Sequence, residues 1–433
     1  MPSLPSRALR RSASDPFFLV FLVTVVLCLL RARDLPTIEV SEAAVGVPDA
    51  ALLVLAVLAA LQLRNGGWRL PSPWLVGVAG AFALLIVGSS LGHGASAFTS
   101  AGKLAELLVL TVAAALALDT EERLEALVMV VLAVCVTGAA WAVVQFVRDG
   151  VGRHPSFLGE HDMAALGTMA IVVGLARLYT RQGGRPSLLT LTALVAGSVA
   201  VTLGAALASL LGLYLAAGAA LALGAVRGEL RRAPLLATLV VLVAVTAGTL
   251  SLRSGELGFL NSWFGAEPDR PGQYAASWSQ RLIYVYIGGR VFLDQPLLGT
   301  GWHGELPPEE YARYLPDARE RFSDQPSHYF PSEDGTFVPQ QTYDQVLYEL
   351  GIVGFVLLLV LLALALRQAV ATALHAPRGP TGEVGYLAVC WLAALLGSLG
   401  GAALFGGSPI AGIFWLTLGV VAAAGSNVPA ART

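Results

Sequence analysis

The sequence predicts an all-α membrane protein that crosses the bilayer about twelve times and carries one large outward-facing loop. The chain has 433 residues, of which 56% are hydrophobic, and its mean hydropathy is +0.70. Only 13% are charged, compared with about 25% in soluble domains. One long polar stretch interrupts the apolar segments. We therefore expect transmembrane helices in residues 1–252 and 344–433, and an extracytoplasmic domain at residues 253–343.

Each expected helix is an apolar run of about the length that a bilayer requires, roughly 20 residues. The first run lies between arginines and lacks a small-x-small cleavage site, which indicates a retained anchor and not a signal peptide. A very tight turn joins the seventh and eighth runs. The twelve expected helices are about Pro16–Leu30, Ala50–Leu63, Trp74–Leu91, Ala101–Leu118, Leu127–Val147, Asp162–Arg177, Leu188–Leu203, Ala205–Val226, Leu235–Leu252, Asp344–Leu366, Val384–Phe405 and Pro409–Ala424.

The arginines favour one orientation in the membrane. If the N-terminus is cytoplasmic, fifteen arginines fall on the cytoplasmic side and four fall in the short loops opposite. Basic residues are enriched in cytoplasmic loops, and long loops do not count in this comparison. We therefore expect both termini in the cytoplasm and the 253–343 loop outside. That loop also holds nearly half of the chain's aromatic residues, which indicates a structured domain.

The composition excludes several other kinds of protein. The net charge is −2, and no basic cluster is dense enough to indicate nucleic-acid binding. The three cysteines, Cys28, Cys135 and Cys390, all lie inside apolar runs. Buried cysteine is typically an inert small hydrophobe, so we expect no disulfide, no metal site and no cofactor.

A helix is expected at Ser277–Leu293 in the long loop, where the sequence D-Q-P ends it. It contains Arg281 and Arg290. Nine residues at about 100° each place these two side chains on opposite faces, so both cannot serve one site. Arg290 has Asp294 four residues on, which predicts a surface ion pair. We therefore expect Arg281 to be the functional arginine; the alternative for either is a solvated or headgroup-bound arginine.

The rest of the loop carries further signals. Gly299 and Gly301 let the backbone pass close to a neighbouring helix or a ligand. Glu305–Arg321 is charged and helix-prone, which predicts an amphipathic helix on the membrane surface. His328 is followed closely by the acidic pair Glu333–Asp334. These three are either a base with its orienting groups or plain turn residues.

The stretch Gln340–Gly354 predicts a helix that begins polar and continues as a membrane span. Glu349 lies inside it. A carboxylate at such a place is costly unless it is paired or faces a wet cavity. We therefore expect an arginine partner for Glu349.

Four stretches resemble the O-antigen ligase and O-antigen polymerase superfamily of bacterial envelope proteins. They are F-L-G-E-H-D-M-A-A-L (Phe157–Leu166), R-L-I-Y-V-Y (Arg281–Tyr286), D-Q-P-L-L-G-T-G-W (Asp294–Trp302) and Y-D-Q-V-L-Y-E-L-G-I-V-G (Tyr343–Gly354). The layout, about twelve spans with a large outer loop after the ninth, is also similar.

The resemblance implies a metal-independent, inverting glycosyltransferase of the bacterial cytoplasmic membrane. Such an enzyme moves a glycan from undecaprenyl diphosphate to a hydroxyl of an acceptor glycan or glycolipid, on the outer face of the lipid bilayer. Arginines would clamp the diphosphate, and a base would assist the acceptor hydroxyl.

The chain departs from the family pattern at two places. Gln340, followed by Gln341, stands where the family usually has a histidine, and glutamine cannot take a proton. No arginine occurs in the turn at Val201–Leu207, where the family often has a Ser-Arg pair. His328 and either Arg148 or Arg153 are candidates to substitute, as are Glu160, His161 and Asp162, whose alternative role is an interfacial polar cap.

The predicted site divides into two groups. The predicted catalytic residues are Arg281, His328 and Gln340, and the predicted substrate-binding residues are Arg290, Gln341, Tyr343, Glu349, Arg153 and His161. Two other functions stay open. A transporter or flippase of lipid-linked sugar is disfavoured because the spans are nearly bare of charge, and a non-catalytic scaffold is suggested by the missing histidine.

Overall fold

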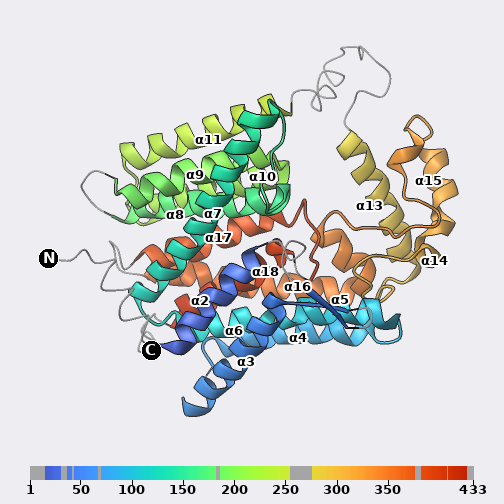
Figure 1. The fold of residues 1–433 in the computed structure, drawn as a ribbon, viewed down its shortest axis with the longest axis horizontal. Coiled ribbons are helices and arrows are strands. Elements are labelled where there is room, and N and C mark those ends of the chain that lie inside the picture. Colours follow the sequence, from blue (N-terminus) through green and yellow to red (C-terminus); the bar gives the residue numbers. More distant parts are fainter. Residues whose placement is uncertain are drawn as a thin grey trace.

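Helices form most of the chain (Figure 1). The computed structural model describes residues 15–30, 37–40, 43–66, 70–181, 186–253, 276–375, 382–406 and 408–426. The arginines before the first helix and loop residues 254–275 therefore lie outside the described residues. The elements in chain order are α2 (Pro16–Leu29), β1 (Thr37–Val40), β2 (Ala43–Gly46), α3 (Val47–Asn65), α4 (Pro73–Ser90), α5 (Gly94–Glu106), α6 (Leu108–Ala117), α7 (Glu121–Asp149), α8 (Glu160–Thr180), α9 (Leu188–Gly204), α10 (Leu207–Val226), α11 (Arg232–Leu252), α13 (Ala276–Asp294), α14 (Pro308–Tyr311), η3 (Ala312–Tyr314), α15 (Leu315–Arg321), η4 (Ser327–Tyr329), α16 (Thr342–His375), α17 (Glu383–Ser398) and α18 (Pro409–Ser426).

Eight helical segments of the described chain are long and apolar enough to cross a membrane. They are α3, α4, α5 with α6, α7, α8, α10, α11 and α16, and four shorter apolar helices (α2, α9, α17 and α18) accompany them. This confirms an all-α, multi-pass architecture, while the count of twelve spans stays a prediction. The sequence did not predict the small antiparallel β1–β2 hairpin, in which Thr37 lies opposite Gly46.

Each predicted segment overlaps an observed helix. The segment predicted at Ala101–Leu118 begins earlier, at Gly94, and Leu107 divides it into α5 and α6. Helix α16 continues past Leu366 to His375, and α17 ends at Ser398 instead of Phe405. Apolar periodicity therefore located the helices but not all of their ends.

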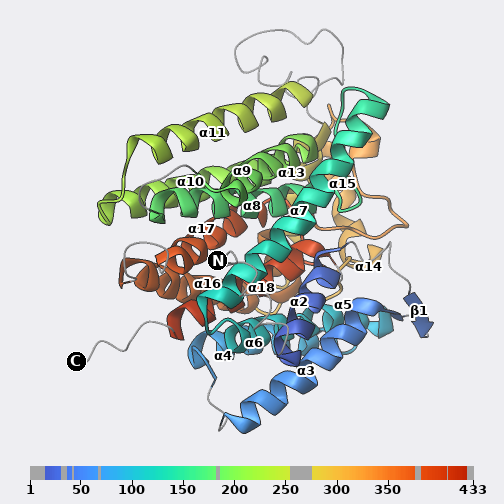
Figure 2. The ribbon, with the colours of Figure 1, turned by 60° about the vertical axis from the view of Figure 1, so that its left-hand side comes forward.

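The helices form layers. In both views α16–α18 lie between α8–α11 on one side and α2–α6 on the other (Figures 1 and 2). Helix α8 is buried on nearly all sides. A Cβ added at Gly167 of α8 would lie 2.8 Å from the Gly197 carbonyl of α9. Because small residues let two membrane helices approach this closely, α8 and α9 pack almost backbone to backbone.

Helix α16 is broken at Gly351, whose φ of 62° and ψ of −163° are not helical. The freed backbone groups bind the D-Q-P-L-L-G-T-G-W segment. Thr300 N–H donates to the Tyr348 carbonyl (3.1 Å), and Ile352 N–H donates to the Pro296 carbonyl (2.9 Å). A Cβ at Gly299 would lie 2.5 Å from the same Tyr348 carbonyl. Of the two neighbours that the sequence allowed for Gly299, a helix or a ligand, the structure shows a helix, α16.

The described part of the long loop, residues 276–341, is here called the loop domain. It has an apolar core that includes Ile287, Tyr311, Leu315 and Phe337. Tyr311 and Leu315 belong to the stretch predicted to be an amphipathic helix on the membrane surface. That prediction was wrong, because α14 and α15 are short and their apolar side chains are buried within the loop domain. The loop domain lies at one end of the bundle, beside the start of α16 (Figure 1).

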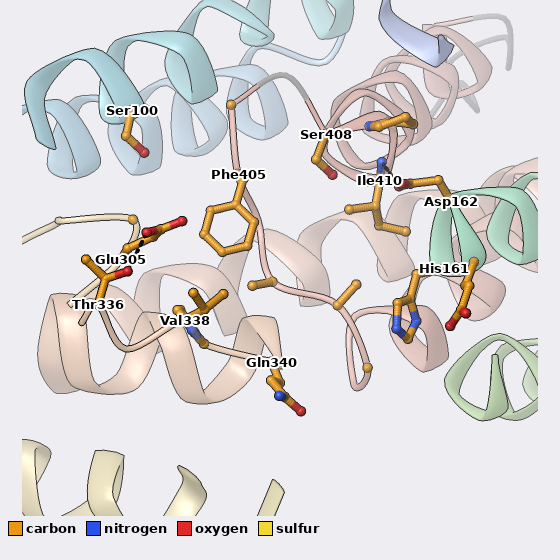
Figure 3. A pocket seen from close by; sticks show the side chains of 18 of the residues that line it. Ser100, His161, Asp162, Glu305, Thr336, Val338, Gln340, Phe405, Ser408 and Ile410 are labelled. Carbon is orange, nitrogen blue, oxygen red and sulfur yellow. Dashed lines mark hydrogen bonds between the residues drawn. The ribbon is translucent and has the colours of Figure 1, made fainter. Parts of the chain in front are cut away.

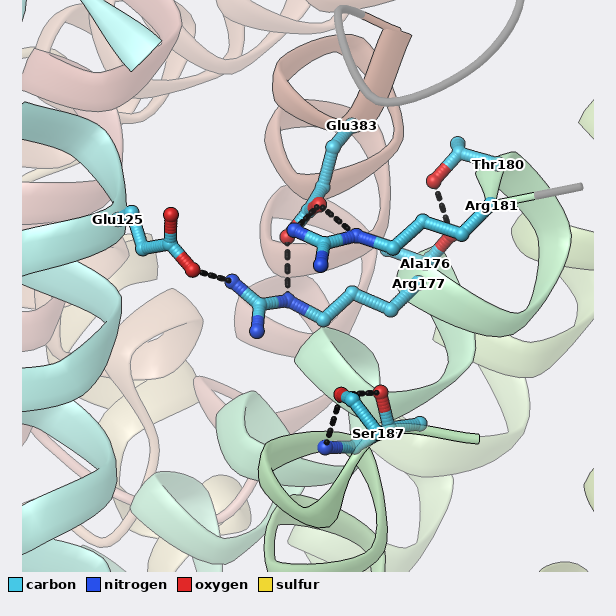
Figure 4. Close-up of polar contacts among 8 residues, drawn as sticks. Glu125, Ala176, Arg177, Thr180, Arg181, Ser187 and Glu383 are labelled. Atoms are coloured by element: carbon cyan, nitrogen blue, oxygen red, sulfur yellow. Dashed lines mark hydrogen bonds and ion pairs between the residues drawn. The ribbon is translucent and has the colours of Figure 1, made fainter. Parts of the chain in front are cut away.

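An ion cluster around the buried pair of Arg177 and Glu383 joins three helices near the last turn of α8, at the opposite end of that helix from Glu160 (Figure 4). Arg177 Nε donates to Glu383 Oε1 at 2.7 Å, and its Nη2 lies 3.4 Å from Glu125. Arg181 pairs with the other Glu383 oxygen at 3.1 Å. Because buried charges must be paired to be tolerated, this cluster fixes α7, α8 and α17 relative to one another.

Candidate functional site

A cavity of about 980 Å³ lies between the helix bundle and the loop domain (Figure 3). The starts of α8 and α18, the ends of α11 and α17, and one face of α5 form its walls, and the loop domain covers it. Figure 3 shows His161 at one end of the cavity and Ser100, Glu305 and Thr336 at the other. Gln340 and Phe405 lie between the two ends.

Three arginines gather at the His161 end. Arg153, Arg253 and Arg281 all line the cavity and lie within electrostatic range of His161. Burial and the neighbouring Arg253 lower the pKa of Arg281, while Asp344 opposes this effect. Three guanidinium groups that share one water-accessible space make a strong binding site for an anion with several oxygens. We call this the cationic end.

Different parts of the chain position these arginines. Arg281 projects from α13 of the loop domain, and Arg153 from the segment before α8, where its Nη1 lies 2.6 Å from Glu160 Oε2. Arg253 directly follows α11, and its Nη1 donates to the Ala205 carbonyl at 3.0 Å. Ala205 lies in the α9–α10 turn. The α9–α10 turn has no arginine of its own, but the guanidinium of Arg253, which follows α11, reaches it.

Comparison with known proteins bears on what kind of protein contains this cavity. No curated protein matches the chain. Residues 192–359 match the family model described as O-antigen ligase. This match covers less than half of the chain and supports its resemblance to the O-antigen ligase and O-antigen polymerase superfamily. The match covers α9 to the first half of α16, so it includes Arg253, Arg281 and Glu349.

The family match and the apolar helices together indicate a multi-pass protein of the bacterial inner membrane. The family match supports an enzymatic, glycan-transferring role in envelope polysaccharide synthesis, and it implies a lipid-linked glycan and an acceptor glycan as substrates.

Four of the nine site residues predicted from the sequence line the cavity: Arg153, His161, Arg281 and Gln340. Arg290 is exposed on the other side of α13, as its helical spacing from Arg281 predicted. Its partner is not Asp294 as predicted but Asp317, at 2.6 Å. Asp294 instead pairs with Arg313 of the loop domain, because tertiary contacts displaced the local pair.

His328 does not reach the cavity. Its ring is exposed and packs against Tyr329, and Glu333, its predicted orienting partner, pairs with Arg319 at 2.6 Å. Of the other sequence candidates, Glu160 and Asp162 line the cavity with His161. Arg148 does not line it and pairs with its neighbour Asp149.

Three predicted binding residues at the start of α16 have structural contacts instead. Tyr343 donates its hydroxyl to the Leu396 carbonyl (2.9 Å), and the Gln341 carbonyl caps the first turn of the helix. Glu349 is fully buried, and its Oε2 accepts the backbone N–H groups of His303 (3.0 Å) and Gly304 (3.1 Å). The arginine partner predicted for Glu349 was therefore wrong.

His303 is a cavity residue that sequence reasoning missed. It follows the G-T-G-W turn, and the only signal was its position next to that motif. Burial and the adjacent His93, whose ring centroid lies 4.3 Å away, lower the pKa of His303 to about 4. His303 is therefore neutral at neutral pH. Its Nε2 is buried and has no hydrogen-bond partner among the described residues.

Proposed function

We propose that the protein transfers a glycan from undecaprenyl diphosphate to a sugar hydroxyl on the outer face of the bacterial cytoplasmic membrane. The observation that carries this proposal is the cationic end, where three arginines surround one end of a 980 Å³ cavity beside apolar helices. A lipid diphosphate needs both environments, because its head group is an anion and its chain is apolar.

The helix ends that line the cavity agree with the proposed orientation. The cavity is bounded by the starts of α8 and α18, by the ends of α11 and α17, and by Gln340 just before α16. These are the helix ends that the arginine distribution assigns to the outer face. Both termini would then be cytoplasmic, and the loop domain would face the periplasm or the cell exterior.

In this proposal the arginines bind the leaving group. Arg253 and Arg281 donate to the diphosphate oxygens, and Arg153 exchanges its Glu160 contact for a phosphate oxygen. Positive groups fixed where negative charge develops lower the barrier more than groups that must first reorganise. Gln340, between the two ends of the cavity, donates a hydrogen bond to the donor sugar, because an amide has N–H donors but cannot act as a base.

Glu305 is the proposed proton acceptor. It lines the cavity, and its Oε2 accepts a hydrogen bond from the Thr336 hydroxyl at 2.7 Å. The acceptor oxygen bonds to the anomeric carbon of the donor. The bond from that carbon to the diphosphate oxygen breaks, and its electron pair leaves with undecaprenyl diphosphate. The acceptor proton moves to Glu305, which replaces His328 in the role predicted from the sequence.

Deletion of the gene tests this function and separates it from its alternatives. Envelope glycans and lipid-linked intermediates from the deletion strain are compared by gel electrophoresis with those of the parent. Loss of long chains together with accumulation of single lipid-linked units indicates a polymerase. Long chains that stay on undecaprenyl diphosphate indicate a ligase. Unchanged glycans would contradict glycan transfer and favour a scaffold.

A further inference from the structure

We propose that one face of α5 forms the acceptor subsite and binds the hydroxyl groups of an uncharged sugar of the acceptor glycan. This inference rests on the proposed function, because it assigns the part of the cavity that the donor diphosphate leaves free. The four residues that form this face are Ser96, Thr99, Ser100 and Lys103.

The spacing of these residues is that of a single helix face. Positions separated by three, four and seven residues lie above one another on an α-helix. All four side chains line the cavity, while Ala97, Ala101 and Leu104, on the neighbouring face of α5, are buried. The hydroxyls of Ser96, Thr99 and Ser100 have no hydrogen-bond partner in the described part of the protein. They are free to bind the hydroxyls of a sugar.

The loop domain supplies the opposite wall. Gly304 lies so close to α5 that a Cβ there would be 2.4 Å from Ser100 Oγ. Beside it stand the hydrogen-bonded pair of Glu305 and Thr336 and the unpartnered Nε2 of His303. In Figure 3, Ser100 faces Glu305 and Thr336 across this end of the cavity. A sugar held here would contact polar groups on both sides.

The charge at this end suits an uncharged ligand. Lys103 Nζ lies 3.2 Å from Asp49 Oδ2, so a nearby carboxylate offsets the ammonium charge. Glu305 adds a negative group that would repel a second phosphate. The cationic end, in contrast, has three arginines for an anion. The cavity therefore separates into a diphosphate end and a hydroxyl-rich end, with the proposed proton acceptor at the latter.

The test is a triple variant, Ser96→Ala, Thr99→Val and Ser100→Ala, in the purified full-length protein. The donor is lipid-linked glycan extracted from the deletion strain, and the acceptor is the glycolipid extract of the same membranes. We expect the KM for acceptor to rise at least about tenfold, since each lost hydrogen bond weakens binding. The affinity of the triple variant for undecaprenyl diphosphate should stay unchanged. The control is Thr137→Val, which removes a hydroxyl from α7 outside the cavity and should change neither the KM for acceptor nor the affinity for undecaprenyl diphosphate.

Thermal stabilisation of the protein by the acceptor extract gives a readout that does not depend on transfer. The extract should stabilise the wild type and the Thr137→Val control, but not the triple variant. Equal stabilisation and an equal acceptor KM in wild type and triple variant would overturn the subsite. If undecaprenyl diphosphate failed to bind the wild type, the proposed function would be wrong. The stabilisation by the acceptor extract would still show whether the face of α5 binds the acceptor.

Discussion

The buried carboxylate of Glu349 binds the segment that carries His303 into the cavity. One of its oxygens accepts two backbone N–H groups, from His303 and Gly304. The side chain itself does not line the cavity. At the scale of single residues, we therefore propose that Glu349 is a positioning residue that acts through the backbone of its neighbours.

Replacing Glu349 separates positioning from binding. Glu349→Ala leaves two buried N–H groups without an acceptor, at about 1–3 kcal/mol each, so its melting temperature and its kcat should both fall. Glu349→Gln keeps an acceptor oxygen and should recover most of the stability and part of the kcat, with little change in donor KM. A donor KM that rises as strongly as kcat falls would show direct binding instead. Glu333→Ala, an exposed carboxylate loss, is the control.

His303 should make stability depend on pH. Its pKa is lowered from 6.5 to about 4, so between these values the unfolded chain binds a proton that the folded chain does not. The free energy of unfolding therefore decreases as pH falls from about 6.5 to about 4.

The His303→Gln variant lacks this titrating group. Melting temperatures measured from pH 7.5 to pH 4.5 should fall less steeply in the variant than in the wild type. Curves that stay parallel over the whole range would contradict the assigned burial of the imidazole.

At the scale of elements, the break in α16 joins the membrane bundle to the loop domain. Gly351 has a positive φ, and a Cβ there would lie 2.4 Å from the Leu297 carbonyl. Gly351→Ala should therefore destabilise the protein by roughly 1–3 kcal/mol and lower activity, because residues 296–301 lose their docking site. Gly218→Ala in α10 is the matched control, since nothing lies within 4 Å of its added methyl group. Equal melting temperatures of the two variants would contradict this role.

Much of this element structure could be predicted from the sequence. Apolar runs located the helices because burial in a bilayer requires them, and helical spacing distinguished Arg281 from Arg290. The hairpin β1–β2 was missed although its two strands are adjacent in sequence. The buried face of α14–α15 could not be predicted, because its partners, among them Ile287 and Phe337, are distant in sequence. Arg253 was missed for the same reason, since only the fold brings the residue after α11 to the α9–α10 turn.

At the scale of the whole molecule, the arrangement favours transfer at one face over transport through the membrane. The charged residues of the candidate site gather at one end of the bundle, while the interior between that end and the Arg177 cluster is apolar. A transporter would need polar groups along such a path. A scaffold without activity would not require three arginines around one cavity.

The central claim is that Arg281, in the cavity, binds the diphosphate of the donor, whereas Arg290 on the same helix does not. The direct measurement is the rate of glycan transfer from extracted lipid-linked glycan by Arg281→Ala and Arg290→Ala, each first shown to be folded by its melting temperature. We predict a loss of at least about a hundredfold in Arg281→Ala and a rate within about twofold of wild type in Arg290→Ala, whose exposed ion pair contributes little. Full activity in Arg281→Ala, or equal losses in both variants, would contradict the account.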